Sequence, residues 1–552
     1  MSEPPRTTGP SFLELGVITA IALAVRLPHL DSATPTYDEF YHLLAARGWL
    51  QDGSFHIGAG HYDRAVLFTR MVAESLRLFG DTLAAGRVPA LLAGTLWVVG
   101  VFWWTRRVAG GLAGWAAALL LALDPGAVYL SQWVRFYTLH GLLVWVGAVC
   151  IYELITRRAE SRRSMGVAAL GAVAWGIAFA LQRSTLVALG AVGLWAAVVL
   201  LGRRGNVLTR AQPRVRLLVI AGGVALCAAA AWLVTSGEAA AIWRIYSNAP
   251  TWAEDSGLGR RWYASWLAGR YSTLCALFPV AVLLAVARFT RPALFALTVF
   301  GTGFVAVSLG APKQERYLYF VLPFFFAIWG FAVAALVPAL RATAERAVAA
   351  VGGSRLHGRS RAGAAWTLTV LAVAVVLLAN DAPRRTWQMV FPGHRARPYR
   401  LSDWTKALPQ LRPLADSADV VIASYILKPI YYLGRGDVAL SGAELAELEW
   451  QNPHPAEFSV DDRTGRPVIS SPASLQRLMA CFRSGLILVE RFHLNRPILV
   501  PAAASAFIAA NTEEVPLPPE SWVHAFRWRH PVPPDQPSCP PWRSSLMTRP
   551  AS

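Results

Sequence analysis

A segment near the N-terminus reads Thr-Pro-Thr-Tyr-Asp-Glu-Phe-Tyr-His and places two adjacent carboxylates beside phenol and imidazole groups. Thr36 and Glu39 have the spacing of a capping box, and acidic side chains suit the N-terminus of a helix. Helix capping therefore explains Glu39. It explains Asp38 less well, and this carboxylate beside Tyr37 and His42 could accept a proton from a hydroxyl group. We predict Asp38 as the principal candidate for acid–base chemistry, with Glu39 as its neighbour.

Four cationic side chains are candidates for binding an anion near these carboxylates. They are Arg64, Arg135, Lys313 and Arg316. Arginine suits bidentate phosphate binding, and lysine offers a point charge. Structural alternatives remain open for each: an ion pair of Arg64 with Asp63, burial of the Arg135 stem at the headgroups, and local pairing of Lys313 or Arg316 with Glu315.

The same polar segments hold further candidates. Asp63, in Gly-His-Tyr-Asp-Arg, is a second candidate acid. The side chains predicted to contact a substrate are Tyr37, His42, His61 and Tyr317. A divalent metal could be held by His42, His56 and His61 together with Asp63 and Glu39, but no spacing requires one. We therefore expect no metal and no other cofactor.

The elements that position these residues follow from composition. Of 552 residues, 55% are hydrophobic and only 15% are charged, which is typical of a membrane protein. The net charge of +19 does not indicate a nucleic-acid partner, because the arginines cluster between apolar runs where an anionic cytoplasmic leaflet would hold them. The chain therefore has the bilayer as a partner.

Apolar runs predict about eleven transmembrane helices within residues 1–380, each near the length needed to cross the hydrocarbon layer. The expected spans are 11–30, 83–104, 111–129, 136–155, 165–181, 186–202, 215–235, 264–287, 292–310, 317–340 and 362–380. Arginines gather in alternate connections, which marks those connections as cytoplasmic. We expect a multi-pass protein of the inner or plasma membrane with a cytoplasmic N-terminus. The loop 31–82 and the segment 381–552 then lie on the extracytoplasmic face.

The loop 31–82 is expected to contain two helices lying in the membrane interface. The first begins at Tyr37, after Thr36. The second covers 64–79 and has apolar side chains on one face and Arg70, Glu74 and Arg77 on the other. Asp38 would then lie in the first turn of an interfacial helix.

The segment 381–552 is expected to be a small α/β domain followed by a Pro-rich tail from about residue 531. Residues 420–423, 438–440 and 486–489 read as buried strands, and 472–482 as a helix. Cys481 and Cys539 could form a disulfide if this domain is extracytoplasmic. There is no Gly-rich phosphate-binding motif, so a nucleotide-sugar substrate is not expected.

Several motifs occur together in the order and spacing of one known family. They are the pair Asp38–Glu39 after the first apolar run, Leu-Phe-Gly-Asp (78–81), Ala-Gly-Arg-Val-Pro-Ala-Leu-Leu-Ala-Gly (85–94), Leu-Ala-Leu-Asp-Pro (121–125), Ser-Gln-Trp-Val-Arg-Phe-Tyr (131–137), Glu-Arg-Tyr-Leu-Tyr-Phe-Val-Leu-Pro (315–323) and Tyr-Tyr-Leu-Gly-Arg (431–435). In this co-linear set the chain resembles the GT-C class of membrane glycosyltransferases, and within it the protein O-mannosyltransferase and aminoarabinose-transferase branch. One departure is that Ala65 and Val66 stand where the family has prolines.

The resemblance implies a polytopic GT-C-like fold and an inverting glycosyltransferase with Asp38 as the catalytic base. The donor would be a sugar linked to polyprenyl phosphate, and the acceptor hydroxyl would belong to a lipid, a glycan or a protein of the cell envelope. Two alternatives remain: a transporter or flippase of lipid-linked sugars, and a non-catalytic subunit of an assembly complex. Against the first, the halves of the chain show no repeat.

Overall fold

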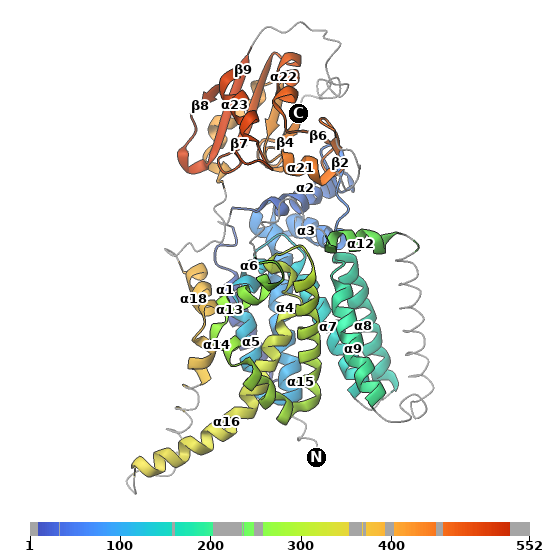
Figure 1. Cartoon of the computed structure of the whole chain (residues 1–552), viewed down its shortest axis with the longest axis vertical. Helices are drawn as coiled ribbons and strands as arrows, with labels where there is room; N and C mark the ends of the chain where they lie inside the picture. Colours follow the sequence, from blue (N-terminus) through green and yellow to red (C-terminus); the bar gives the residue numbers. More distant parts are fainter. Residues whose placement is uncertain are drawn as a thin grey trace.

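The computed structural model describes residues 9–31, 34–156, 161–202, 235, 237–247, 258–352, 367, 371, 373–391, 402–448 and 456–529. These residues form a bundle of long apolar helices and, at the other end of the molecule, a domain built on a mixed sheet (Figure 1). Two helices of the loop 31–82 lie between these parts (Figure 1). We call the part built on the sheet, residues 402–529, the sheet domain.

The bundle is made of helices whose side chains are apolar on every face, as expected for segments surrounded by lipid and by other helices. In the described part of the chain, five helices are long and apolar enough to cross a membrane: α4 (Leu83–Ala109), α7 (Tyr137–Thr156), α8 (Ser161–Leu181), α15 (Phe278–Leu309) and α16 (Leu322–Gly352). The pair α5 (Gly111–Ala122) and α6 (Pro125–Ser131) is bent by 64° and would make a sixth span. The chain is thus a helical membrane protein, and the number eleven stays a prediction.

Several expected spans differ in detail from the observed helices. α1 (Phe12–Arg26) and α9 (Thr185–Gly202) are shorter apolar helices. The two spans expected over 264–287 and 292–310 correspond to α13 (Trp262–Arg270), α14 (Ser272–Ala276) and α15, whose backbone breaks at Phe289 (φ −127°, ψ 50°). Of the expected span 215–235 all but residue 235, and of the span 362–380 residues 362–366, 368–370 and 372, lie outside the described residues.

The two helices predicted for the loop 31–82 are confirmed as α2 (Tyr37–Asp52) and α3 (Val66–Phe79), and their place in the membrane interface stays a prediction. α2 begins with the predicted capping box, since the Thr36 N–H donates to Glu39 Oε2 at 2.7 Å. α3 starts two residues later than predicted, because Ala65 has a left-handed backbone (φ 53°) that cannot belong to a helix. A short hairpin, β1 (His56–Ile57) and β2 (Gly60–His61), connects the two helices.

The sheet domain confirms the predicted α/β character. Its seven strands have the order β5-β6-β4-β3-β7-β9-β8. They are β3 (Val420–Ala423), β4 (Val438–Leu440), β5 (Val460–Asp461), β6 (Arg466–Ile469), β7 (Ser484–Glu490), β8 (Glu513–Val515) and β9 (Val523–Arg529). β6, β4, β3 and β7 are parallel, and the outer pairs are antiparallel. The strands predicted at 420–423, 438–440 and 486–489 are β3, β4 and the centre of β7.

Helices cover both faces of this sheet, as parallel strands require. They are α19 (Leu408–Ser417), α20 (Leu427–Leu433), α21 (Gly442–Glu447), α22 (Pro472–Cys481) and α23 (Ala502–Asn511). The predicted helix 472–482 is α22. Cys481 at its end is disulfide-bonded, whereas Cys539 and the Pro-rich tail lie outside the described residues.

A charged pair lies inside the sheet domain. Lys428 and Glu490 are 1% and 0% exposed, and they form a salt bridge. Lys428 also donates to Ser402 Oγ at 2.7 Å, and Trp404 Nε1 donates to Glu490 Oε1 at 2.9 Å. Such a pair ties α20 to the end of β7, because each buried charge depends on the other.

The segment after residue 380 begins beside the bundle. α18 (Asp381–Val390) packs near α6, and Thr386 Oγ1 donates to the backbone oxygen of Leu123 at 2.6 Å. Asn380 accepts hydrogen bonds from the backbone of Thr273 and Leu274. These contacts fix the start of the expected C-terminal segment against the transmembrane part.

Candidate active site

Asp38 lies in the first turn of α2, where its carboxylate meets two arginines from distant parts of the chain. Arg316 Nη1 is 3.2 Å from Asp38 Oδ2, and Arg135 Nη2 is 3.5 Å from the same oxygen. The two arginine side chains are 16% and 3% exposed, but Asp38 is 30% exposed. Both cations therefore hold one carboxylate oxygen, while the carboxylate stays partly open to solvent.

These arginines dominate the ionisation of Asp38. Burial alone would raise its pKa, but Arg135, Arg316 and Arg64 outweigh burial and lower the pKa to about 2. Asp38 is therefore a carboxylate throughout the neutral range. An anion bound to the same arginines would neutralise part of this effect and make the carboxylate more basic.

A layer of polar and aromatic groups supports Arg135. Its Nη1 lies 3.3 Å from the Tyr62 hydroxyl and 3.4 Å from His42 Nε2. The other ring nitrogen of His42 is 2.8 Å from Thr69 Oγ1 on α3. Burial, then Arg135 and Arg64, lower the pKa of His42 well below its usual value. His42 is therefore a neutral imidazole that orients Arg135.

The other predicted residues of the loop 31–82 lie further out. Asp63, Arg64 and His61 are exposed. Arg64 Nη2 contacts Gln182 Oε1 at 3.4 Å, and its guanidinium lies 5.7 Å from the Phe136 ring. Arg64 thus lies near the two arginines and influences Asp38, although it forms no ion pair with Asp38.

Two predicted residues of the connection before α16 differ in their surroundings. Arg316 stacks on Tyr317, with 5.5 Å from guanidinium carbon to ring centroid, and this pair borders Asp38. The Lys313 ammonium instead donates to backbone oxygens at the end of α15, including Ser308 at 2.7 Å and Gly310. The structure thus brings Arg316 and Tyr317 to the site and places the Lys313 amine on a helix end.

Glu39 is enclosed, in contrast to Asp38. It is 0% exposed and forms a salt bridge with Arg87, whose Nε lies 3.0 Å from Oε1 and which is 1% exposed. The Val134 N–H donates to Oε1 at 3.0 Å, and the Thr36 N–H donates to Oε2. Glu39 therefore anchors α2 to α4 and to the connection before α7.

Similarity to known proteins is found at the level of the fold. No protein-family model matches the chain. The crystal structure of ArnT from Cupriavidus metallidurans bound to undecaprenyl phosphate superposes with a TM-score of 0.61 at 16% identity, over 96% of this chain and 100% of that chain. AglB of Archaeoglobus fulgidus, an oligosaccharyltransferase solved with an inhibitory peptide and a dolichol-phosphate, gives a TM-score of 0.53 at 12% identity, over 86% of this chain and 68% of that chain.

The chain has the GT-C fold. The resemblance that the sequence motifs predict is thereby confirmed at the level of the fold. A curated protein of Mycobacterium leprae (strain TN), named "Probable arabinosyltransferase A", is 28% identical over 304 residues. That match covers 51% of this chain but only 26% of the mycobacterial protein, so this chain spans about a quarter of its length.

Within this GT-C fold a second polar centre lies where no site was predicted from the sequence. Asp124 caps α6 by accepting the Ala127 N–H at 2.5 Å, and it also accepts a hydrogen bond from the Tyr271 hydroxyl. Arg270 beside it donates to the Tyr319 hydroxyl at 2.9 Å. The motif Leu-Ala-Leu-Asp-Pro contained the signal for the helix cap, but its tyrosine partner is 147 residues away in the chain.

An apolar cavity of about 160 Å³ adjoins this second centre. It is lined by Ala116, Leu119, Leu120, Leu123, Tyr271, Ala374, Leu377, Leu378, Ala382 and Pro383. The cavity therefore reaches from the break between α5 and α6 to the start of α18. Its lining suits a hydrocarbon chain rather than a polar ligand.

Sequence reasoning also missed Arg87 and the two tyrosines that frame Arg135 and Arg316, which are Tyr62 and Tyr137. Arg316 lies 5.7 Å from the Tyr137 ring, and Arg135 lies 5.6 Å from it. Tyr137 is the last residue of the motif Ser-Gln-Trp-Val-Arg-Phe-Tyr, so its position beside Arg135 could have been noticed. Within the described residues, no three His, Cys, Asp or Glu side chains form a group suited to a metal ion.

Proposed function

We propose that this protein is an inverting glycosyltransferase that moves a sugar from a polyprenyl-phosphate-linked donor to an acceptor hydroxyl on the extracytoplasmic face of the membrane. The observation that carries the proposal is the partly exposed Asp38 carboxylate held beside Arg135 and Arg316. The GT-C fold supports it, since the structural relative ArnT was solved with undecaprenyl phosphate. The acceptor would be a lipid, a glycan or a protein.

In the proposed reaction the donor phosphate lies against the guanidinium groups of Arg135 and Arg316, with Arg64 at the entrance. An arginine side chain can donate two parallel hydrogen bonds to two phosphate oxygens. It thereby stabilises the negative charge that develops on the phosphate as the sugar leaves. The apolar cavity beside Tyr271 suits part of the carrier chain. The chain's own residues thus supply positioning and electrostatic stabilisation.

The bond changes follow from this arrangement. The acceptor oxygen forms a bond to C1 of the sugar, and the bond between C1 and the phosphate oxygen breaks with its electron pair leaving on the polyprenyl phosphate. The proton of the acceptor hydroxyl passes to the Asp38 carboxylate and then to solvent. Phosphate binding offsets the arginine charges that hold the pKa of Asp38 at about 2, so the carboxylate becomes a better base when donor is present.

The test is a transfer assay with purified protein and a pool of polyprenyl-phosphate sugars, in which release of sugar from the carrier is followed. Wild type is compared with Asp38→Asn and with Asp63→Asn, an exposed acid of the same loop. We expect Asp38→Asn to lose about 10²–10⁴-fold in rate, as for removal of a general base. Equal turnover by wild type and Asp38→Asn would exclude Asp38 from the reaction. Carrier-lipid movement without any sugar release would favour a flippase.

A further inference from the structure

The first turn of α2 contacts the sheet domain through the residue that precedes Asp38. The Tyr37 hydroxyl donates to Glu444 Oε1 at 2.5 Å. The Tyr37 ring stacks on Tyr425, which follows β3, with 4.4 Å between ring centroids and 24° between planes. Tyr37 is therefore held by both a hydrogen bond and a ring stack from the sheet domain.

The same helix is held one turn further along. The guanidinium of Arg463 lies 5.1 Å from the centroid of the Tyr41 ring. Arg463 is fixed in turn by Asp461 at 2.9 Å and by Glu447 at 3.0 Å. Tyr37 and Tyr41 are four residues apart, so they lie on one face of α2. That face is the surface on which the sheet domain rests.

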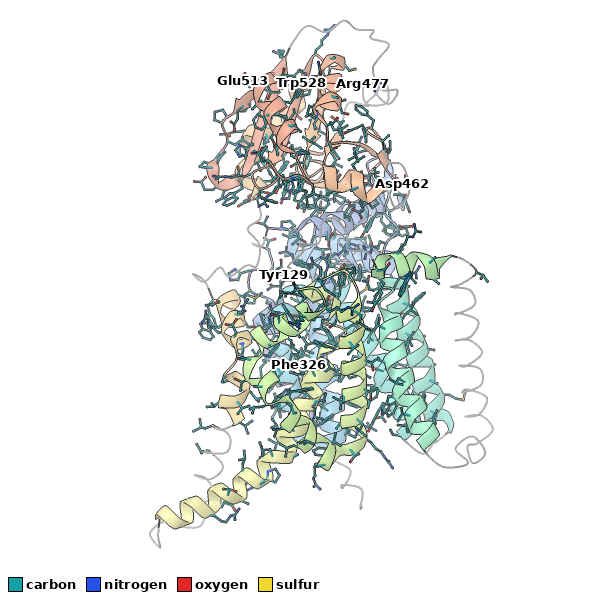
Figure 2. All side chains as sticks on the ribbon, viewed as in Figure 1. Tyr129, Phe326, Asp462, Arg477, Glu513 and Trp528 are labelled. Carbon is teal, nitrogen blue, oxygen red and sulfur yellow. The ribbon has the colours of Figure 1, made fainter. Side chains whose placement is uncertain are left out.

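Backbone contacts complete the interface. The His61 N–H donates to the Asp462 oxygen at 2.8 Å. A Cβ atom added at Gly60 would lie 2.4 Å from the Thr464 and Gly465 nitrogens, closer than real side chains approach. Asp462 lies at the edge of the sheet domain that is nearest to α2 and α3 (Figure 2). The two parts therefore meet through closely fitted surfaces.

From these contacts we infer that Glu444 is a positioning residue for Asp38, acting through Tyr37 to fix the first turn of α2 against the sheet domain. The inference rests on the proposed function, because Asp38 needs a fixed place only if it acts on a substrate. Asp38 is covalently next to Tyr37, so a shift of the Tyr37 backbone moves the carboxylate relative to Arg135 and Arg316. A displacement of about 1 Å can cost on the order of 10²-fold in rate.

Ionisation of Glu444 gives this contact a measurable signature. Burial raises the pKa of Glu444 to about 7, with Asp461 and Glu447 acting in the same direction, while the Tyr37 hydrogen bond and Arg463 act against it. The other titratable groups that face it are Tyr41 and Tyr425, both of which stay neutral because burial raises their pKa values. Glu444 is thus a buried carboxyl group at this interface with a pKa near neutrality.

The direction in which pH changes the docking of α2 on the sheet domain follows from thermodynamic linkage. The pKa of Glu444 is higher in the docked state than in a solvated chain, so docking favours the protonated carboxyl. Its contribution is complete below the solvated value near 4.5 and is lost as the pH rises through about 7. Without donor, the pKa of Asp38 is about 2, but bound phosphate raises it. A change in kcat near pH 7 is therefore assigned to Glu444 only when Glu444→Gln abolishes it.

The experiment compares wild type, Glu444→Gln, Tyr37→Phe and a matched control, Glu513→Gln, between about pH 5.5 and about pH 8.5. Glu513 lies on the exposed strand β8, at the end of the sheet domain remote from α2 (Figure 2), and it pairs with Arg527 of β9. We expect kcat of wild type and of the control to fall several-fold through about pH 7, with little change in donor KM. Glu444→Gln keeps a neutral hydrogen-bonding group, so we expect its kcat to lose this inflection. Tyr37→Phe should lower kcat at every pH.

Two outcomes separate the inference from the proposed function. If Asp38→Asn is inactive but Glu444→Gln keeps the wild-type pH profile, Glu444 does not position Asp38 and the glycosyltransferase proposal stands. If no variant transfers sugar, the proposed function fails and hydrogen exchange of the α2 amides tests the contact. Exchange in α2 that increases with pH more in wild type than in Glu444→Gln supports the contact. The same increase in both proteins overturns it.

Discussion

Asp38 and Glu39 are consecutive acids in one helical turn, and the structure gives them opposite surroundings. Glu39 is 0% exposed, and its two oxygens accept hydrogen bonds from Arg87 and from two backbone N–H groups. Asp38 is 30% exposed, and both of its arginines contact the same oxygen. Consecutive helical residues point about 100° apart, so one carboxylate enters the bundle while the other faces the arginines.

The comparison shows how a structural carboxylate differs from one that is proposed to react. A buried carboxylate with every lone pair engaged has no capacity left for a substrate, and its role is to hold elements together. A carboxylate that remains partly exposed beside an excess of positive charge can still contact a substrate hydroxyl. For these two neighbours, the partners of each oxygen are more informative than the residue type.

The largest difference between the two acids should appear in activity. Asp38→Asn keeps the shape of the side chain but removes the proton acceptor, so we expect the transfer rate to fall by about 10²–10⁴-fold. The thermal midpoint in detergent should fall less than for Glu39→Gln, because the Asp38 carboxylate is 30% exposed whereas Glu39 is fully enclosed. A large loss of stability in this variant would remove the contrast with Glu39.

The second largest effect on activity should come from changing an arginine that contacts Asp38. Arg316→Gln removes a guanidinium that lies 3.2 Å from Asp38. We expect a loss on the order of 10²-fold in kcat/KM for the donor, similar to the loss of one charge-stabilising donor in other enzymes. Kinetics at varied donor concentration would measure it. Arg341→Gln is a suitable control, since Arg341 pairs with Glu345 on the exposed end of α16.

How much of the fold and of the candidate site can be predicted from the sequence depends on how far apart the interacting residues lie along the chain. The start of α2, its capping box and strands β3, β4 and β7 were predictable, because they follow from local spacing and hydrophobic pattern. Arg316 was identified as a candidate cation, but its contact with Asp38 joins residues 278 positions apart. Only the packed bundle brings them together.

Other features could not be predicted for the same reason. Arg87 looked like part of an apolar span, and its pairing with Glu39, 48 positions away, depends on how α2 lies on α4. Glu444 lies in a short helix with no motif, and its role follows only from the docking of the sheet domain on Tyr37. Lys313 was a candidate for binding an anion, yet its amine is bound by carbonyls at the end of α15.

The third prediction concerns the stability that Glu39 contributes to the folded protein. Glu39→Gln leaves Arg87 buried without a counter-charge, and breaking a buried pair in this way typically costs about 3–5 kcal/mol. We expect a clear drop in the thermal midpoint, measured in detergent beside Asp38→Asn. The transfer rate per folded molecule should change far less than in Asp38→Asn. A Glu39→Gln protein that is stable but inactive would instead place Glu39 in the reaction.

The smallest effect should come from Lys313, whose ammonium contacts Ser308 and Gly310 oxygens at the end of α15. A cation at a helix C-terminus typically contributes about 0.3–1 kcal/mol, so Lys313→Met should lower stability only slightly. Donor KM should stay within about twofold of wild type, because the amine is engaged by carbonyls rather than directed at Asp38. The control is Lys406→Met, an exposed lysine of the sheet domain. A tenfold rise in donor KM for Lys313→Met alone would mean that the amine leaves these carbonyls to bind phosphate, and Lys313 would then join Arg135 and Arg316 as the sequence suggested.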